Sequence, residues 1–187
     1  MSREPAGSAV EYQVTYLQMD ARPSYDYPTQ PAHLKGAALQ RAEAPPAWYF
    51  FNLYDAVGSN YEWVDMHAKS SAEITEWLHA PGMALYTLLG QGWPKGFFLL
   101  DGREDTTVDL AYFGLVPEAV GQGFGTWFLR TAILMAWDRP GTQSVTVNTC
   151  TLDHPRALAH YQKQGFVPQR QETRTRILTR DQSVAST

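Results

Sequence analysis

The sequence predicts an α/β (α+β) fold, with a mixed central sheet of six to seven strands and flanking helices. One observation is the order of its periodic segments, which is β, helices, β, β, β, α, β, α, β, followed in a seven-strand version by a last β. The other is size. The 187 residues are 44% hydrophobic, which suffices for one substantial core and is short for two domains.

The first half of the chain supplies three strands and the helices between them. Residues 11–19 alternate as a strand, and residues 23–46 contain five prolines around one short helical candidate at residues 34–42. Two helices and two strands are then expected at residues 48–54, 71–79, 83–90 and 96–101.

The second half begins with the fourth strand, at residues 106–116. Period-two alternation places one apolar set on its core face, namely Val108, Leu110, Tyr112, Gly114 and Val116. Helical spacing follows over residues 122–137 and ends at Arg139-Pro140-Gly141. A fifth strand, a helix with its following turn, and a last strand are expected at residues 144–150, 154–166 and 171–178.

The ends of the chain suggest its domain organisation. We expect a disordered tail at residues 1–9, one domain over residues 10–180 and a C-terminal tail at residues 181–187. The first residues lack the apolar stretch of a signal peptide, and no apolar run approaches the roughly 20 residues of a membrane span. We therefore expect a cytoplasmic protein without a membrane partner.

Charge and potential metal ligands argue against several functions. The formal net charge is −4 and the Lys and Arg residues form no cluster, so nucleic acid is not an expected partner. The single cysteine, Cys150, cannot form an internal disulfide, and the five histidines lack the spacing of a zinc site. We expect no metal.

Three alternating glycines, Gly121, Gly123 and Gly125, join the fourth strand to the following helix. Glycines let the backbone approach a phosphate closely, and a helix N-terminus points free N–H groups at the anion. A dinucleotide-binding fingerprint would need glycine where Thr126 or Phe128 stands, and a P-loop would need Lys directly after the last glycine. The loop therefore predicts a phosphate-bearing ligand bound in neither of these two ways.

Two segments, in order along the chain, resemble the GNAT superfamily of N-acetyltransferases. Residues 116–125 resemble its acyl-CoA signature, with Val116-Pro117-Glu118 ahead of the glycines. Residues 154–166 resemble its later segment, in which Tyr161 precedes Gly165-Phe166. Val120 and His154 depart from the pattern, because the family usually has Arg or Gln at the first position and Asn at the second. The two segments span roughly residues 106–170.

The resemblance implies that acetyl-CoA binds between splayed strands four and five. An isolated glycine in a strand often marks a bulge, so Gly114 is expected either to form the family's bulge or to pack closely against a neighbour. The implied cofactor-binding residues are Phe113, Leu115 and Val116 along the pantetheine arm, Gly121, Gln122, Gly123, Phe124, Gly125 and Thr126 around the pyrophosphate through their amides, and Arg156 at the 3′-phosphate or adenine.

The resemblance also implies the catalytic groups. Tyr161 matches the acid that protonates the departing CoA thiolate, although it could instead be a packing aromatic. Asp109 lies in the fourth strand at a spacing where some members carry a base, and its alternative role is that of a solvated strand residue. His154 is more easily explained as a hydrogen-bonding residue than as a base, and Asp153 is the expected N-cap of the helix.

Residues 48–65 predict the acceptor site. Aromatic and acidic residues alternate there, which suits a cationic amine, and we select Tyr61 and Glu62 as substrate contacts. The alternative is that the aromatics form core and the acids face water.

We therefore predict an N-acetyltransferase that moves an acetyl group from acetyl-CoA to a primary amine, by direct attack in a ternary complex. Its partner would be a small-molecule or peptide amine, and edge strands of this fold can pair into a homodimer. A second hypothesis is a non-catalytic acyl-CoA-binding sensor of the same fold, supported by the departures at Val120 and His154. A hydrolase is disfavoured because the chain lacks a G-x-S-x-G elbow.

Overall fold

The computed structural model describes residues 2–34 and 36–184. Its strands are β1 (Ser2–Glu4), β2 (Ala9–Met19), β3 (Ala38–Ala42), β4 (Met83–Gly90), β5 (Trp93–Asp101), β6 (Thr107–Leu115), β7 (Ser144–Cys150), β8 (Val167–Ile177) and β9 (Gln182–Val184). Its helices are α1 (Ala47–Gly58), α2 (Ser71–His79), α3 (Phe124–Trp137) and α4 (Ala157–Lys163), with short 3-10 turns η1 (Ala32–Leu34), η2 (Asp65–Ala68) and η3 (Pro117–Ala119).

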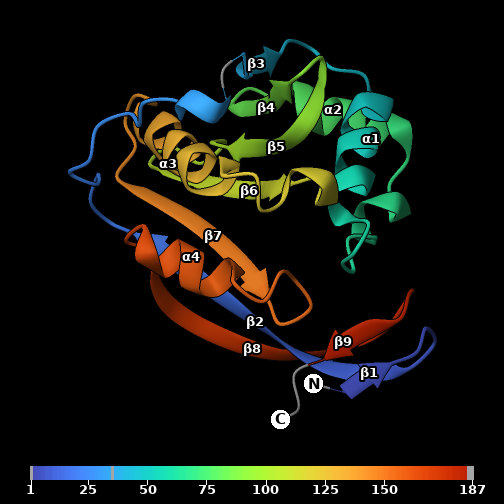
Figure 1. The fold of residues 1–187 in the computed structure, drawn as a ribbon. Coiled ribbons are helices and arrows are strands. Elements are labelled where there is room, and N and C mark those ends of the chain that lie inside the picture. Colours follow the sequence, from blue (N-terminus) through green and yellow to red (C-terminus); the bar gives the residue numbers. More distant parts are fainter. Residues whose placement is uncertain (1, 35, 185–187) are drawn as a thin grey trace.

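Seven strands form one mixed sheet in the order β3-β4-β5-β6-β7-β2-β8 (Figure 1). Helices cover both of its faces, as two adjacent residues of β5 show. Phe97 packs its ring edge-on against Phe50 of α1, while Phe98 contacts Phe128 of α3. Since successive residues of a strand point to opposite faces, α1 and α3 lie on opposite sides of the sheet. The predicted α/β fold is confirmed.

Strands β6 and β7 separate soon after they meet. They pair in parallel only at Thr107–Asp109 and Ser144–Thr146, and beyond these residues they diverge (Figure 1). They are the fourth and fifth strands of the predicted order. The splayed pair therefore lies where the resemblance placed it, and the edge of β6 that faces β7 has no strand partner over its second half.

A bulge lies in β6 at Ala111. Leu99 of β5 pairs with Tyr112 whereas Leu100 pairs with Leu110, so one residue of β6 is left without a partner. The bulge prediction for Gly114 is wrong, because Gly114 pairs regularly with Phe97.

Gly114 is explained by the alternative, close packing. A methyl group built there would overlap Cγ1 of Val57 on α1.

The bulge changes which residues of β6 share a face. Residues that pair with alternate positions of β5 lie on one face, so Leu110 shares a face with Phe113, and Asp109 shares the opposite face with Tyr112. The sequence prediction, which assumed strict alternation, placed Leu110 and Tyr112 on the same face of the strand. It is wrong for the residues that follow the bulge.

Three segments differ from their predicted structure. The helical candidate at residues 34–42 is wrong, because Ala38–Ala42 pairs with β4 as an edge strand and only η1 is helical. The predicted tails are also ordered in part, because β1 and β9 pair antiparallel as a second, two-stranded sheet. Residues 1 and 185–187 of those tails lie outside the described residues.

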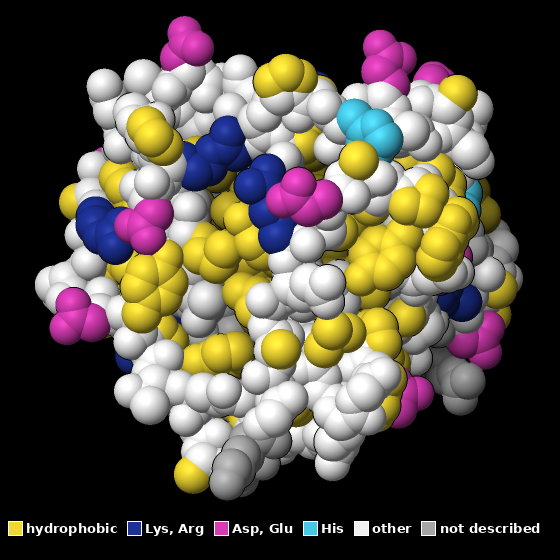
Figure 2. Space-filling view, turned by 90° about the horizontal axis from the view of Figure 1, so that it is seen from above, with side chains coloured by type: hydrophobic (Ala, Val, Ile, Leu, Met, Phe, Trp, Pro, Cys, Tyr) yellow, Lys and Arg dark blue, Asp and Glu magenta, His cyan; other side chains and the backbone are white. Residues whose placement is uncertain are grey.

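Figure 2 shows one face of the molecule, where a small group of Lys and Arg side chains is bordered by acidic and hydrophobic ones. Among the helices that the structure describes, none is both long and apolar enough to cross a membrane.

Replacing Gly114 by Ala should lower the free energy of unfolding by about 1–3 kcal/mol, because the new methyl group overpacks against Val57. Urea unfolding measures this. In the double variant Gly114→Ala, Val57→Ala, the free energy of unfolding should fall by less than the sum of the two single losses, since the smaller side chain at position 57 makes room for the new methyl group. Strictly additive losses would show that the two residues are not in contact.

Candidate active site

A cavity of about 880 Å³ occupies the opening between β6 and β7. Leu110–Leu115 of β6 line one wall and residues 148–150 of β7 line the other. The glycine loop, α4 and parts of β2 and β8 complete it. Most of the predicted site residues meet in this one cavity, although they come from distant parts of the sequence.

The glycine loop presents backbone amides to the cavity. Gly121 and Gly123 have φ angles of 84° and 87°, a left-handed conformation that glycine adopts without strain. Gly123 is the N-cap of α3, and no side chain caps the helix there. The N–H groups of the first turn therefore have no partner within the helix, and the positive end of the helix dipole lies at the same place.

Four of the six predicted loop residues line the cavity: Gly121, Gly123, Gly125 and Thr126. Gln122 is not among them: its N–H donates to the Ala119 carbonyl (3.3 Å) and its side chain to the Glu118 carbonyl, and its role in binding stays a prediction. Phe124 buries its side chain in the core, which leaves only its amide for a ligand.

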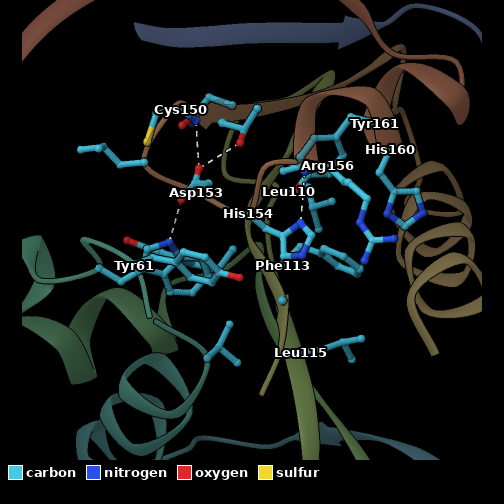
Figure 3. Close-up of a pocket in the computed structure, with 18 of the residues that line it drawn as sticks. Tyr61, Leu110, Phe113, Leu115, Cys150, Asp153, His154, Arg156, His160 and Tyr161 are labelled. Atoms are coloured by element: carbon cyan, nitrogen blue, oxygen red, sulfur yellow. Dashed lines mark hydrogen bonds between the residues drawn. The ribbon is translucent and has the colours of Figure 1, made fainter. Parts of the chain in front are cut away.

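A group of cationic side chains borders the loop. Arg156, His160 and Lys163 recur along α4 at helical spacing and line the cavity together with His154, and Figure 3 shows Arg156 beside His160. His160 Nε2 lies 3.5 Å from Thr126 Oγ1. Burial, followed by the charges of Lys163 and Arg156, lowers the pKa of His160. Of this group we predicted only Arg156, although the i, i+4, i+7 spacing was visible in the sequence.

Tyr161 points from α4 into the cavity wall and is only 7% exposed. Its ring packs edge-on against Phe113 and Phe166. Burial raises the pKa of the Tyr161 hydroxyl well above its usual range, and the charges of Asp153 and Asp109 act in the same direction. The phenol is therefore protonated at neutral pH, and its hydroxyl makes no hydrogen bond with any residue that the structure describes.

The strand residues predicted for the pantetheine arm divide into two groups. Phe113 and Leu115 line the cavity on the unpaired stretch of β6. Val116 does not, because its N–H donates to the Lys95 carbonyl (2.9 Å) and its side chain is buried. The role of Val116 at the pantetheine arm stays a prediction.

Asp109 lies outside this cavity. It pairs with Thr146 in the closed part of the β6–β7 pair, and its carboxylate accepts a hydrogen bond from Thr146 Oγ1 (2.7 Å). It lines a second cavity of about 390 Å³, together with Asp101 and Glu104. Burial raises the pKa of Asp109, while the Thr146 hydrogen bond opposes the rise.

Glu62 lines the cavity, but its carboxylate is engaged by the protein. The side chain is buried, and its oxygens accept hydrogen bonds from the Thr179 amide (3.1 and 3.2 Å) and hydroxyl (3.1 Å). It ties the segment after α1 to the segment after β8, and its role as a substrate contact stays a prediction. Tyr61 lines the cavity, and burial, followed by the charge of Asp153, raises its pKa.

Asp153 is a cavity residue whose place we did not predict. Its Oδ1 accepts a hydrogen bond from Trp63 Nε1 (3.1 Å), and its Oδ2 accepts from Thr149 Oγ1 and the Cys150 amide, both at 2.9 Å (Figure 3). It is not the helix N-cap, because that position belongs to Arg156.

Cys150 lines the cavity beside Asp153. Burial, reinforced by the Asp153 charge, raises the pKa of its thiol to about 12. Because the thiolate is the nucleophilic form, the cavity does not activate Cys150 for covalent catalysis.

Comparisons with solved structures agree with this geometry. A GCN5-related N-acetyltransferase from Sphaerobacter thermophilus matches with a TM-score of 0.62 at 13% identity, over 99% of this chain and 56% of the other. A spermidine N-acetyltransferase SpeG chimera from Vibrio cholerae and hSSAT matches with a TM-score of 0.59 at 17% identity, over 78% and 90%.

A GNAT family acetyltransferase from Elizabethkingia anophelis, solved with acetyl-CoA bound, matches with a TM-score of 0.53 at 19% identity, over 71% of this chain and 77% of the other. Several other matched chains are longer, and this chain spans 52% to 62% of their length. At these identities the matches show the fold alone.

The sequence comparisons show the family. A search of the curated proteins gives no match. The family model described as Acetyltransferase (GNAT) family matches residues 50–166, which is more than half of the 187 residues. The resemblance inferred from the two sequence segments is thus confirmed, and the chain belongs to the GNAT family of acetyltransferases.

Proposed function

We propose that this protein transfers an acetyl group from acetyl-CoA to a primary amine, by direct attack of the amine in a ternary complex. The observation that supports this most strongly is a single cavity that contains open helix N-terminal amides, an unpaired strand edge and a buried, protonated tyrosine. When bound, acetyl-CoA supplies the activated acyl group as a thioester.

The residues present fit the phosphates of this cosubstrate. The amides of Gly123, Gly125 and Thr126 would hold the pyrophosphate, because they have no helical partner and no side-chain cap competes for them. Arg156 adds a cationic side chain beside the loop, and His160 adds an imidazole that a bound phosphate would favour in its protonated form. The edge of β6 at Phe113 and Leu115 would pair with the extended pantetheine arm as an additional strand would.

Tyr161 is the proposed general acid. A departing thiolate needs a proton, and the raised pKa keeps the phenol protonated at the pH where the amine reacts. The raised pKa of Cys150 supports direct attack, because a protonated thiol does not accept the acetyl group first.

The acceptor must lose a proton before it attacks, because an alkylammonium has a pKa near 10.4. We propose that Asp109 accepts this proton, because it shares the face of β6 that carries the cavity residue Tyr112. Since Asp109 itself lies outside the main cavity, ordered water would carry the proton to it. Its raised pKa brings it closer to the working pH of a base.

The partner we propose is a small-molecule or peptide amine. The cytoplasmic location remains a prediction, and so does a homodimer, for which β3 and β8 provide the two edges of the main sheet.

The test of the function is release of free thiol from acetyl-CoA in the presence of a broad panel of amines, detected colorimetrically. Thiol release that depends on the amine, with acetylated amine seen by mass spectrometry, is the expected result. Tight acetyl-CoA binding with no transfer to any amine would support the sensor hypothesis instead. Absence of acetyl-CoA binding would contradict both hypotheses.

Tyr161→Phe should lower kcat about 100-fold, the usual contribution of a general acid, and leave the KM for acetyl-CoA nearly unchanged. Tyr27→Phe is the control, because the Tyr27 hydroxyl bonds Asp138 away from the cavity. Equal turnover in the two variants would remove Tyr161 from the mechanism.

Asp109→Asn tests the proposed base. Because a base acts when deprotonated, the wild-type kcat/KM should rise with pH through the raised pKa of Asp109. The variant should lack this rise, and its kcat/KM should be about 100-fold lower than that of the wild type. A variant with the wild-type pH profile would exclude Asp109 and leave deprotonation to bulk water.

His160→Gln tests the cationic border of the loop. The lowered pKa keeps His160 neutral in the free protein at pH 7.5, and a bound phosphate favours the protonated ring, so binding takes up a proton. Acetyl-CoA affinity of the wild type relative to His160→Gln should therefore increase by about three- to tenfold between pH 7.5 and pH 6. Dividing the wild-type affinity by the affinity of His160→Gln at each pH removes the effect of titrating acetyl-CoA itself. A ratio that does not change with pH would show that the phosphates do not bind beside His160.

A further inference from the structure

The cavity carries opposite charges on two of its walls, away from the glycine loop. Asp153 lies on the wall formed by the end of β7, and Arg174 and Arg176 lie on β8. Tyr12 and Tyr16 of β2 form the floor between them. This arrangement bears on which amine the proposed acetyl transfer uses.

Arg174 has hydrogen-bonding capacity left for a ligand. Its Nη2 donates to Tyr16 Oη and to Glu172 Oε2, both at 2.7 Å, and its Nε donates to the same Glu172 oxygen. Nη1 makes no hydrogen bond with any residue in the described part of the chain. Glu172 also pairs with Arg170, so one carboxylate is shared between two guanidinium groups and the charge of Arg174 is only partly compensated.

Arg176 is held by the protein itself. Its Nη1 donates to the Glu62 carbonyl (3.1 Å) and its Nη2 to Asp65 Oδ1 (3.0 Å). Its buried Nε lies 3.7 Å from Glu62 Oε2, so two carboxylates compensate its charge. The positive charge of this wall therefore comes mainly from Arg174.

Asp153 provides the negative wall. Three protein donors fix its carboxylate, and Oδ1 receives only one of them, so it can still accept a hydrogen bond from an ammonium group. Asp153 and Tyr161 line the same cavity, and Figure 3 labels both. An amine bound at Asp153 would therefore share this cavity with the proposed acid.

The strand pairing gives the spacing of the two strands that carry these walls. Val14 of β2 pairs with Cys150 on one side and with Glu172 on the other, so β2 lies between the end of β7 and the part of β8 next to Arg174. Two strand spacings separate β7 from β8, which is about 10 Å. The Arg174 side chain crosses part of this distance, because its Nη2 reaches Tyr16 Oη on β2, so the charged groups lie closer together than the strand backbones.

We propose that the acceptor is a zwitterionic amine, an amino acid or short peptide whose ammonium group binds at Asp153 and whose carboxylate binds Arg174. This rests on the acetyl transfer proposed above. A linear polyamine fits less well, because it would place a second ammonium group against Arg174.

The test compares kcat/KM for free acids with that for their carboxamides, which lack the negative charge, and kcat/KM is expressed per unprotonated amine because the carboxamide also lowers the pKa of the ammonium group. The probes are the twenty standard amino acids, glycylglycine and triglycine, each with its carboxamide, and spermidine. For the substrates that are acetylated, the free acid should exceed the carboxamide by about tenfold or more, the effect of one charge-assisted hydrogen bond.

Arg174→Gln should reduce the acid-to-amide ratio about tenfold towards unity. Arg22→Gln is the matched control, because Arg22 is 45% exposed against 49% for Arg174, pairs with a single carboxylate and lines neither cavity. This control should keep the wild-type ratio.

Equal rates for acids and carboxamides, or faster acetylation of spermidine than of any zwitterion, would overturn the inference and leave the acetyl transfer intact. An unchanged ratio in Arg174→Gln would also overturn it. Failure to acetylate any amine would instead overturn the proposed function, and this inference with it.

Discussion

The site depends on one constraint, the early separation of β6 and β7. These strands pair for only three residues, so a sheet that is otherwise continuous is left open between its two halves. The open edge of β6 carries N–H and C=O groups that need partners, and the N-terminus of α3 adds further free amides at the same place. The protein thus keeps backbone hydrogen-bonding capacity for a ligand that brings both an extended arm and phosphates.

Packing around β6 places the side chains of this opening on separate faces of the strand. The bulge at Ala111 puts Phe113 on the side of Tyr161, and Tyr112 on the side of the aromatic cluster from α1. The absent side chain of Gly114 lets α1 approach at Val57. Helices α1 and α4 therefore reach the cavity from opposite faces of β6.

Hydrogen bonding, more than residue type, separates the roles of the carboxylates near the cavity. Glu62 is buried and satisfied by Thr179, which makes it a structural tie between distant segments. Asp153 is also held by three donors, yet it retains accepting capacity and lines the cavity. Asp109 is held by Thr146 at the end of the closed stretch of the β6–β7 pair and lines the second cavity. Only the surroundings of each group distinguish them.

The sequence alone determined the features that depend on local interactions. The boundaries of α2, β4 and β7 match the prediction, and the start of α2 rests on a reciprocal hydrogen-bonded cap between Ser70 and Glu73. The glycine loop and Tyr161 were likewise visible as short motifs, because their spacing is set along one loop and one helix. The tertiary structure decided the bulge at Ala111, the strand at Ala38–Ala42 and the partner of Glu62, 117 residues away. Each of these depends on a partner strand or side chain that is distant in the chain, and such contacts leave no periodic signal at the residue itself.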